Sequence, residues 1–214
     1  MSANSQTIII ANGRFPTDET PLSFIKNADF IVCCDGAVND FITCGGKPDA
    51  IVGDCDSISE ENRIRYADII FADDDQYTND LTKAVTFCVN QRRTNIVILG
   101  GTGKREDHTL GNISLLMEYM KIANVKMVTN YGVFTPICSD TSFKSFEGQQ
   151  VSLFTIDNAP ITTHNLKYPL HKAILTNWWQ GTLNESCGDV FSIETGGRMV
   201  VFQCLVVKKH CFCH

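Results

Sequence analysis

Short apolar segments alternate with segments of helical spacing over the first 130 residues, and this alternation limits the folds open to the chain more than any other feature. Several short segments are apolar at consecutive positions, as is typical of strands covered on both faces. The predicted strands are 7–11, 30–34, 50–53, 68–72, 95–100 and 125–129, and the clearest predicted helices are 79–91 and 108–122. This order of elements predicts a parallel, doubly wound sheet.

A β-rich pattern replaces the alternation after about residue 135, and no convincing helical period follows. The predicted strands there are 150–156, 171–177, 189–195 and 199–207. We therefore expect a Rossmann-like α/β domain over 1–135 and an all-β sandwich or barrel over 136–214. So small a sheet gains stability by packing on a neighbour or on a second copy of the chain.

Charge and hydropathy exclude several classes of protein. The net charge of −6 argues against a general nucleic-acid binder, which usually carries a basic face. The chain has no 18-residue apolar run and no signal-peptide pattern at its N-terminus, so we expect a cytoplasmic protein without a membrane span. In a reducing cytosol, Cys33, Cys34, Cys88 and Cys204 are expected to be small core residues.

Acidic residues gather after two of the predicted strands. Asp54 and Asp56 follow one strand at positions i and i+2, and in an extended chain their side chains point the same way. Such a pair is suited to Mg²⁺ carrying a nucleotide polyphosphate. The alternative is a solvated turn, which also favours Asp. Asp73 and Asp74 fit such a turn, and Asp75 fits either role.

A predicted helix start lies close to this acidic segment. Asn79 is suited to be the N-cap, which places Asp80 in the first helical turn and Lys83 one turn later on the same face. An Asp and a Lys that converge at a helix start can hold a metal and a phosphate oxygen, respectively. The alternative for Lys83 is a surface ion pair.

A glycine-containing loop, LGGTGKREDHTLGN (99–112), joins a predicted strand to a helix. It matches neither the dinucleotide fingerprint nor the P-loop. Gly100, Gly101 and Gly103 allow the backbone to approach a ligand closely. Arg105 is a natural phosphate ligand, Asp107 could cap the helix, and His108 could reach a ribose, phosphate or base. The alternative is a plain strand-to-helix turn.

Two further segments carry candidate ligand contacts. Asp35 and Gly36 end the second predicted strand, which in a parallel sheet opens on the same crevice as Asp54 and Gly100. In the β-rich part, Trp178 and Trp179 are adjacent. If that segment is extended, one indole is in the core and the other could stack on a flat ligand, although both could be structural. The tail 210–214 carries His and Cys spaced too tightly for the usual zinc sites.

Taken in order, these motifs resemble those of the thiamin pyrophosphokinase family. The resemblance rests on CDGA (34–37), GDCDS (53–57), DQYTNDLTK (75–83) and LGGTGKREDH (99–108), and extends to KYPL (167–170) and GTLNE (181–185). Two departures are Asn79, where the family has Thr, and Leu183, where it usually has Ser.

The resemblance implies a homodimeric, Mg²⁺-dependent enzyme that transfers the β,γ-diphosphate of ATP to the hydroxyl of thiamine, giving thiamine diphosphate and AMP. It implies these roles: Mg²⁺ on Asp54, Asp56 and Asp80, with Lys83 assisting catalysis; ATP near Asp35, Gly36, Gly100, Gly101, Gly103, Arg105, Asp107 and His108; thiamine near Gln76, Trp178, Trp179, Thr182 and Asn184. Two alternatives are a pyrophosphokinase with another acceptor, such as a pterin, and a non-catalytic nucleotide or thiamine sensor.

Overall fold

A computed structural model describes residues 5–205, which form two compact units divided between Asn130 and Tyr131. The division comes earlier than residue 135 because strand β7 (Gly132–Ile137) already pairs with β13 (Met199–Cys204) of the second unit. The His/Cys tail at 210–214, and the last two residues of the strand predicted at 199–207, lie outside the described part of the chain.

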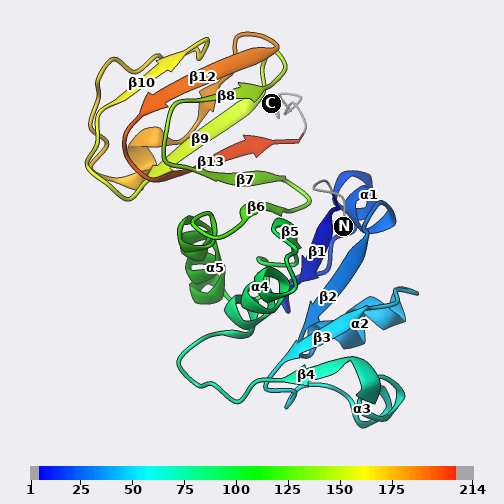
Figure 1. The fold of residues 1–214 in the computed structure, drawn as a ribbon. Helices are drawn as coiled ribbons and strands as arrows, with labels where there is room; N and C mark the ends of the chain where they lie inside the picture. The colour runs from blue at the N-terminus through cyan, green and yellow to red at the C-terminus, as the bar shows by residue number, and fades with distance from the viewer. Residues whose placement is uncertain (1–4, 206–214) are drawn as a thin grey trace. The chain divides into compact units, whose positions relative to one another are not determined.

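The first unit is built on six parallel strands in the order β6-β5-β1-β2-β3-β4 (Figure 1). Their bounds are β1 Thr7–Ile10, β2 Phe30–Cys34, β3 Ala50–Gly53, β4 Ile70–Ala72, β5 Asn95–Leu99 and β6 Asn124–Val128. All six had been predicted, and β4 starts late because a 3₁₀ turn, η1 (Ala67–Ile69), occupies the first part of its segment. The central strands β1 and β5 are buried throughout, apart from the partly exposed Asn95, which agrees with their continuous apolar sequence.

Five helices connect these strands: α1 (Glu19–Lys26), α2 (Ala37–Thr43), α3 (Glu60–Arg65), α4 (Asp80–Asn90) and α5 (Glu106–Tyr119). In Figure 1, α4 and α5 lie on one side of the sheet, while α1 and α2 lie on the other. Helix α4 belongs to the crossover from the edge strand β4 back to β5, and it packs on β1, β2 and β3 along the way. This crossover brings the start of α4 next to the carboxyl end of β3.

The second unit contains two antiparallel sheets, β11-β9-β13-β7 and β10-β12-β8. The remaining bounds are β8 Thr141–Lys144, β9 Gln150–Thr155, β10 Ile161–His164, β11 Asn184–Glu185 and β12 Val190–Thr195. Leu153 and Val201 from one sheet share a single buried cluster with Phe143, Phe191 and Ile193 from the other. The unit is therefore a β-sandwich.

One predicted strand of the second unit is wrong. Segment 171–177 forms only an isolated bridge, between Ala173 and Ile161, and leads into a 3₁₀ helix, η2 (Trp178–Gly181). Strands β7, β8, β10 and β11 were not predicted. Strands β8, β10 and β11 are short and rich in polar residues, and β7 contains Gly132 and Pro136, which obscure the alternation.

Burial of the cysteines agrees in part with the sequence. Cys33, Cys34 and Cys88 are core residues, as predicted, whereas Cys204 is only half-buried. Cys55 is also buried. Among residues 5–205, no helix is long and apolar enough to cross a membrane.

The core of the sandwich provides a test of its stability. Phe191 is fully buried and stacks on Phe143 with ring centroids 5.0 Å apart. Because truncation leaves a cavity, Phe191→Ala should lower the free energy of unfolding by about 3–5 kcal/mol, measured by urea denaturation. Val190→Ala, one position away on the same strand at a half-exposed site, should change it by less than about 0.5 kcal/mol. Equal effects of the two substitutions would contradict this description of the core.

Candidate active site

The carboxyl ends of the parallel strands open into a cleft of about 320 Å³ within the first unit. The cleft lies where the strand order reverses, since β1 is flanked by β2 on one side and by β5 on the other. Ligands of doubly wound proteins bind at such a point. The loops after β1, β2, β3 and β5 and the N-termini of α4 and α5 line the cleft.

Three carboxylates converge on this cleft. Asp35 follows β2, whereas Asp54 and Asp56 follow β3, and one oxygen of each lies within 4.8 Å of the others. Asp35 is only 3% exposed, and the backbone N–H of Ser57 donates to its carboxylate at 3.4 Å. Three carboxylates this close, one of them buried, fit a hard divalent cation such as Mg²⁺.

The chain between Asp54 and Asp56 is a tight turn, not the extended segment that the i, i+2 argument assumed. Cys55 adopts φ = 63°, and the backbone N–H of Asp56 donates to Oδ1 of Asp54 at 3.3 Å. The guanidinium of Arg63, on α3, donates to the carbonyl of Cys55. A left-handed residue therefore brings the two carboxylates together, in place of strand periodicity.

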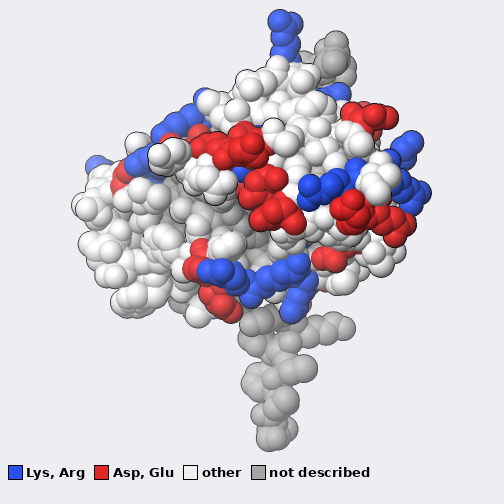
Figure 2. All heavy atoms as spheres, turned by 90° about the horizontal axis from the view of Figure 1, so that it is seen from below, with Lys and Arg blue, Asp and Glu red and all other residues white. Residues whose placement is uncertain are grey.

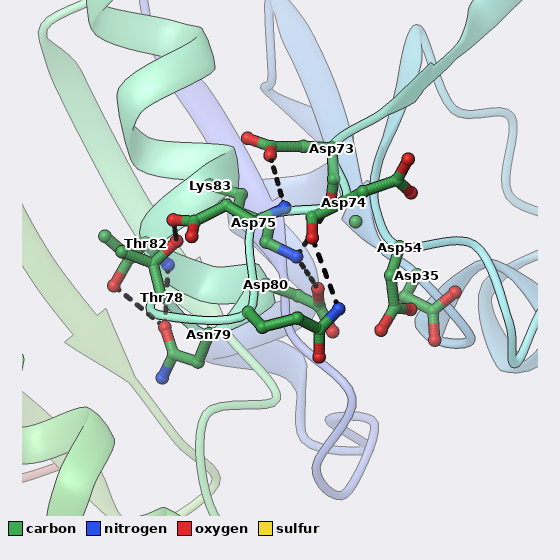
Figure 3. Close-up of polar contacts among 12 residues, drawn as sticks. Asp35, Asp54, Asp73, Asp74, Asp75, Thr78, Asn79, Asp80, Thr82 and Lys83 are labelled. Carbon is green, nitrogen blue, oxygen red and sulfur yellow. Dashed lines mark hydrogen bonds and ion pairs between the residues drawn. The ribbon is translucent and has the colours of Figure 1, made fainter.

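Asp80 faces this cluster from the first turn of α4, beside Asp35 and Asp54 (Figure 3). Burial raises the pKa of Asp80, and the negative charge of Asp54 raises it further, while the charge of Lys83 opposes both. Gly53 allows the approach, because a Cβ there would lie 2.9 Å from the Asp35 Cβ and 3.0 Å from Oδ1 of Asp80.

The cluster differs in one member from the predicted metal ligands. Asp35 belongs to it, although the sequence had suggested a nucleotide contact, and Asp80 lies beside Asp35 and Asp54 without being one of the three. A signal for Asp35 was present in the sequence, because it follows a buried apolar strand just as Asp54 does.

The acidic stretch after β4 is an exposed loop, residues 73–79, that bonds mainly to itself. Asp73 accepts from the backbone N–H of Asp75 at 3.0 Å. Asp75 in turn accepts from the N–H of Tyr77 at 2.9 Å and from the hydroxyl of Thr78 at 2.8 Å, and these bonds lower its pKa. Asp75 is thus a turn residue, while Gln76 is exposed on the same loop.

The start of α4 has the predicted cap but places Lys83 differently. Asn79 is the N-cap, since its side-chain oxygen accepts from the backbone N–H of Thr82 at 2.9 Å. Lys83 is buried, and its ammonium lies 2.8 Å from the carbonyl oxygen of Asp73 and 3.5 Å from Oδ1 of Asp80. It therefore forms an i, i+3 pair, but not on the surface.

The glycine loop packs directly against the chain that follows β1. The backbone N–H of Gly13 donates to the carbonyl of Gly100 at 2.7 Å. Gly100 has φ = 66°, and a Cβ there would lie 2.5 Å from the carbonyl oxygen of Ala11, so only glycine fits. Gly101 lines the cleft directly.

Positive side chains border the cleft on the side of this loop. Arg105 lines it, and so does Lys104, whose ammonium lies 3.1 Å from the Asn12 side chain and 3.5 Å from Asp40. His108 lines the cleft as well. The sequence had not assigned Lys104 to the site. On the face drawn in Figure 2, basic side chains are interspersed with acidic ones and do not form one basic surface.

Asp107 is not the helix cap that had been predicted. Arg105 is the N-cap residue of α5, without a side-chain bond, and Asp107 lies inside the first turn. The carboxylate of Asp107 accepts from Arg105 and from the backbone N–H of His108, which together lower its pKa to about 2. Asp107 therefore orients Arg105.

Hydrogen bonds connect the start of α4 to the glycine loop. The Asn79 amide donates to Asn112 of α5 at 3.5 Å, and the Asn112 amide donates to the carbonyl of Gly101 at 2.9 Å. The hydroxyl of Thr82, on α4, also lies 2.7 Å from the hydroxyl of Tyr119, on α5. The acidic side and the glycine side of the cleft are thereby joined through side chains.

In the second unit, the tryptophans lie on η2 and not on an extended segment. The indole N–H of Trp178 donates to the carbonyl of Thr155 at 3.0 Å, whereas Trp179 is 73% exposed. The Thr182 hydroxyl donates to the carbonyl of Trp179 at 2.7 Å. Asn184 is buried, and its amide bonds to the backbone of Tyr168 in both directions.

Comparison with known proteins identifies both units. A sequence model of "Thiamin pyrophosphokinase, catalytic domain" matches residues 22–129, and one of "Thiamin pyrophosphokinase, substrate-binding domain" matches residues 132–202.

Individual relatives carry the same family name. Thiamin pyrophosphokinase 1 of Caenorhabditis elegans is 35% identical over 104 residues, which are 44% of this chain and 42% of the relative. Thiamine pyrophosphokinase of Bacillus subtilis is 32% identical over 148 residues, 63% of this chain and 67% of the relative. This chain spans about half the length of two curated relatives: 42% of the Caenorhabditis elegans protein and 57% of thiamine pyrophosphokinase 1 of Oryza sativa subsp. japonica.

Solved structures share the fold. Thiamin pyrophosphokinase from Candida albicans superposes with a TM-score of 0.81 at 19% identity, covering 94% of this chain and 89% of the other. The Bacillus subtilis enzyme gives 0.79 at 20% identity, covering 94% and 99%. With the two family domains matched in order along the chain, the conclusion is direct: this chain belongs to the thiamin pyrophosphokinase family.

Proposed function

We propose that the protein is a thiamine diphosphokinase, which transfers the β,γ-diphosphate of ATP to the hydroxyl of thiamine and releases AMP. The observation that carries the proposal is the convergence of Asp35, Asp54 and Asp56 on a cleft whose opposite side is a glycine loop with cationic neighbours. Carboxylates for a metal and a loop open to phosphates are the two parts that a nucleotide polyphosphate needs. Family membership supports the choice of substrates.

In this proposal Asp35, Asp54 and Asp56 hold Mg²⁺, with Asp80 beside them. When bound, the metal supplies positive charge to the phosphate oxygens as negative charge develops on them. The cluster suits that role because four carboxylates repel one another unless a cation lies between them.

The remaining residues of the cleft position the substrates. Gly101 lets the phosphates approach the backbone, and Lys104 and Arg105 lie near enough to neutralise them. The thiamine hydroxyl loses its proton as its oxygen bonds to the β-phosphorus, and the bond from that phosphorus to the oxygen of AMP breaks. Most of the rate acceleration then comes from positioning and electrostatics.

The second unit and the exposed loop complete the proposal. In the first unit, Gln76 on the exposed loop is the candidate for thiamine contact. In the second unit, the candidates are the exposed indole of Trp179 together with Trp178, Thr182 and Asn184. The working form is a cytoplasmic homodimer, in which the second copy adds the packing that a small β-sandwich gains from a neighbour.

Product analysis tests the reaction itself. Incubation with ATP, Mg²⁺ and thiamine should yield AMP and thiamine diphosphate in equal amounts, detected by chromatography. Formation of ADP with thiamine monophosphate would instead indicate an ordinary kinase, and absence of any thiamine phosphate would overturn the proposal.

Removing a carboxylate charge from the cluster should slow turnover. Asp35→Asn and Asp54→Asn should each lower kcat by about 10²- to 10³-fold, because the metal loses a charged ligand. Asp74→Asn makes the same change on the exposed loop and should leave kcat within about twofold, since surface substitutions have small effects. Circular dichroism should show all three variants folded. Near-normal turnover in the first two would refute the metal assignment.

Binding of the metal should also be visible without nucleotide. Added Mg²⁺ should raise the melting temperature of the wild-type protein, because a ligand that binds only the folded state stabilises it. EDTA should reverse the shift, and Asp35→Asn should abolish it. A shift of the same size in Asp35→Asn would mean that the ion binds elsewhere.

A further inference from the structure

Lys83 has a buried charge and lies outside the cleft, although one of its partners, Asp80, lines the cleft. Its side chain is 3% exposed, and its ammonium is bonded to the carbonyl of Asp73 and paired with Asp80 (Figure 3). A buried ammonium is costly unless such partners satisfy it. Lys83 does not line the 320 Å³ cleft, but lines a separate groove of about 370 Å³ together with Phe71 and Phe87.

The carbonyl that Lys83 holds belongs to the first residue of loop 73–79. On its other side, the backbone N–H of Asp73 donates to the carbonyl of Gly53, at the end of β3, at 2.9 Å. Asp73 is therefore fixed from two directions, by the sheet and by α4. Gly53 also directly precedes Asp54 of the carboxylate cluster.

The rest of the loop has few other means of staying ordered. Its residues are exposed, with Tyr77 at 99%, so it has no apolar core of its own. Its internal bonds join neighbouring residues and are accepted by Asp73, Asp74 and Asp75. The order of such a loop depends on how its two ends are anchored: Asn79 caps α4 at one end, and Lys83 holds Asp73 at the other.

We propose that Lys83 is a positioning residue, which clamps the start of loop 73–79 onto the first turn of α4. By bonding Asp73 and Asp80 with one ammonium, it sets Asp80 and the exposed Gln76 at fixed places relative to the carboxylate cluster. Its effect on catalysis rests on the proposed function, whereas its effect on the loop does not. The alternative, a direct bond from Lys83 to a phosphate, requires a phosphate oxygen to reach a buried ammonium that does not line the cleft.

Hydrogen exchange of the ligand-free protein separates these roles. Lys83→Met removes the ammonium but keeps a long side chain, so the backbone amides of Asp73, Asp75 and Tyr77 should exchange about tenfold faster, as expected when a charge-assisted hydrogen bond is lost. Lys121→Met is the matched control, because Lys121 also forms an i, i+3 pair, with Glu118, but at an exposed site. The control should leave these rates unchanged.

Kinetics give the second readout. If Lys83 is a clamp, Lys83→Met should lower kcat by about tenfold or more and change the KM for ATP by less than about twofold. Unchanged exchange together with a raised KM for ATP would overturn the clamp and support the phosphate role. If Lys83→Met does not fold, Lys83→Gln, which keeps a neutral donor, is measured in its place and should show a smaller increase in exchange.

The two proposals can fail separately. If the wild-type protein forms no AMP and thiamine diphosphate, the diphosphokinase function is refuted, and the exchange rates alone then decide the role of Lys83. If the wild-type protein is active but exchange in loop 73–79 is the same in Lys83→Met as in the wild type, the clamp is refuted.

Discussion

Asp35, Asp54 and Asp56 bring three carboxylate oxygens within 4.8 Å of one another, and the surrounding chain holds them there against their mutual repulsion. Asp35 and Asp54 directly follow buried strands, and Asp56 follows the left-handed turn at Cys55, so the backbone brings the three carboxylates together. Asp80 adds a fourth negative charge from α4, and its raised pKa reflects the burial and the charge that this arrangement imposes. Lys83 lies outside the cleft and offsets part of the negative charge of Asp80.

The close approach of these groups depends on a few backbone positions. Gly53 leaves room between Asp35 and Asp80, and Cys55 turns the chain in a left-handed conformation that Arg63 holds from α3. On the opposite side, Gly100 lies against the carbonyl of Ala11 with no space for a side chain. Each feature costs free energy, either as backbone strain or as conformational freedom lost on folding. Such costs are typical of functional sites, where the exact positions of groups matter more than stability.

The sequence predicted the strands of the first unit and the cap at Asn79 because both follow from local chemistry. Continuous apolar segments mark buried parallel strands, and Asn before an acidic first turn marks a helix start. The burial of Lys83 could not be predicted, because it depends on how distant strands and helices are packed. Asp35 follows a buried strand as Asp54 does, but the meeting of their carboxylates depends on the same packing. The strand predicted at 171–177 failed for a similar reason. Leu175 of this segment joins the core from a loop, whereas Ile174 next to it is exposed.

The path of α4 has a consequence for how the protein becomes active. The helix crosses back over β3, β2 and β1 to connect the edge strand β4 with β5, and the two sides of the cleft lie before and after it in the chain. No short fragment contains both sides, and contacts between such distant segments are slow to form. The cleft is therefore complete only after α4 has packed across the sheet and β5 has joined it. Binding of a ligand in the cleft thus indicates that the first unit is fully folded.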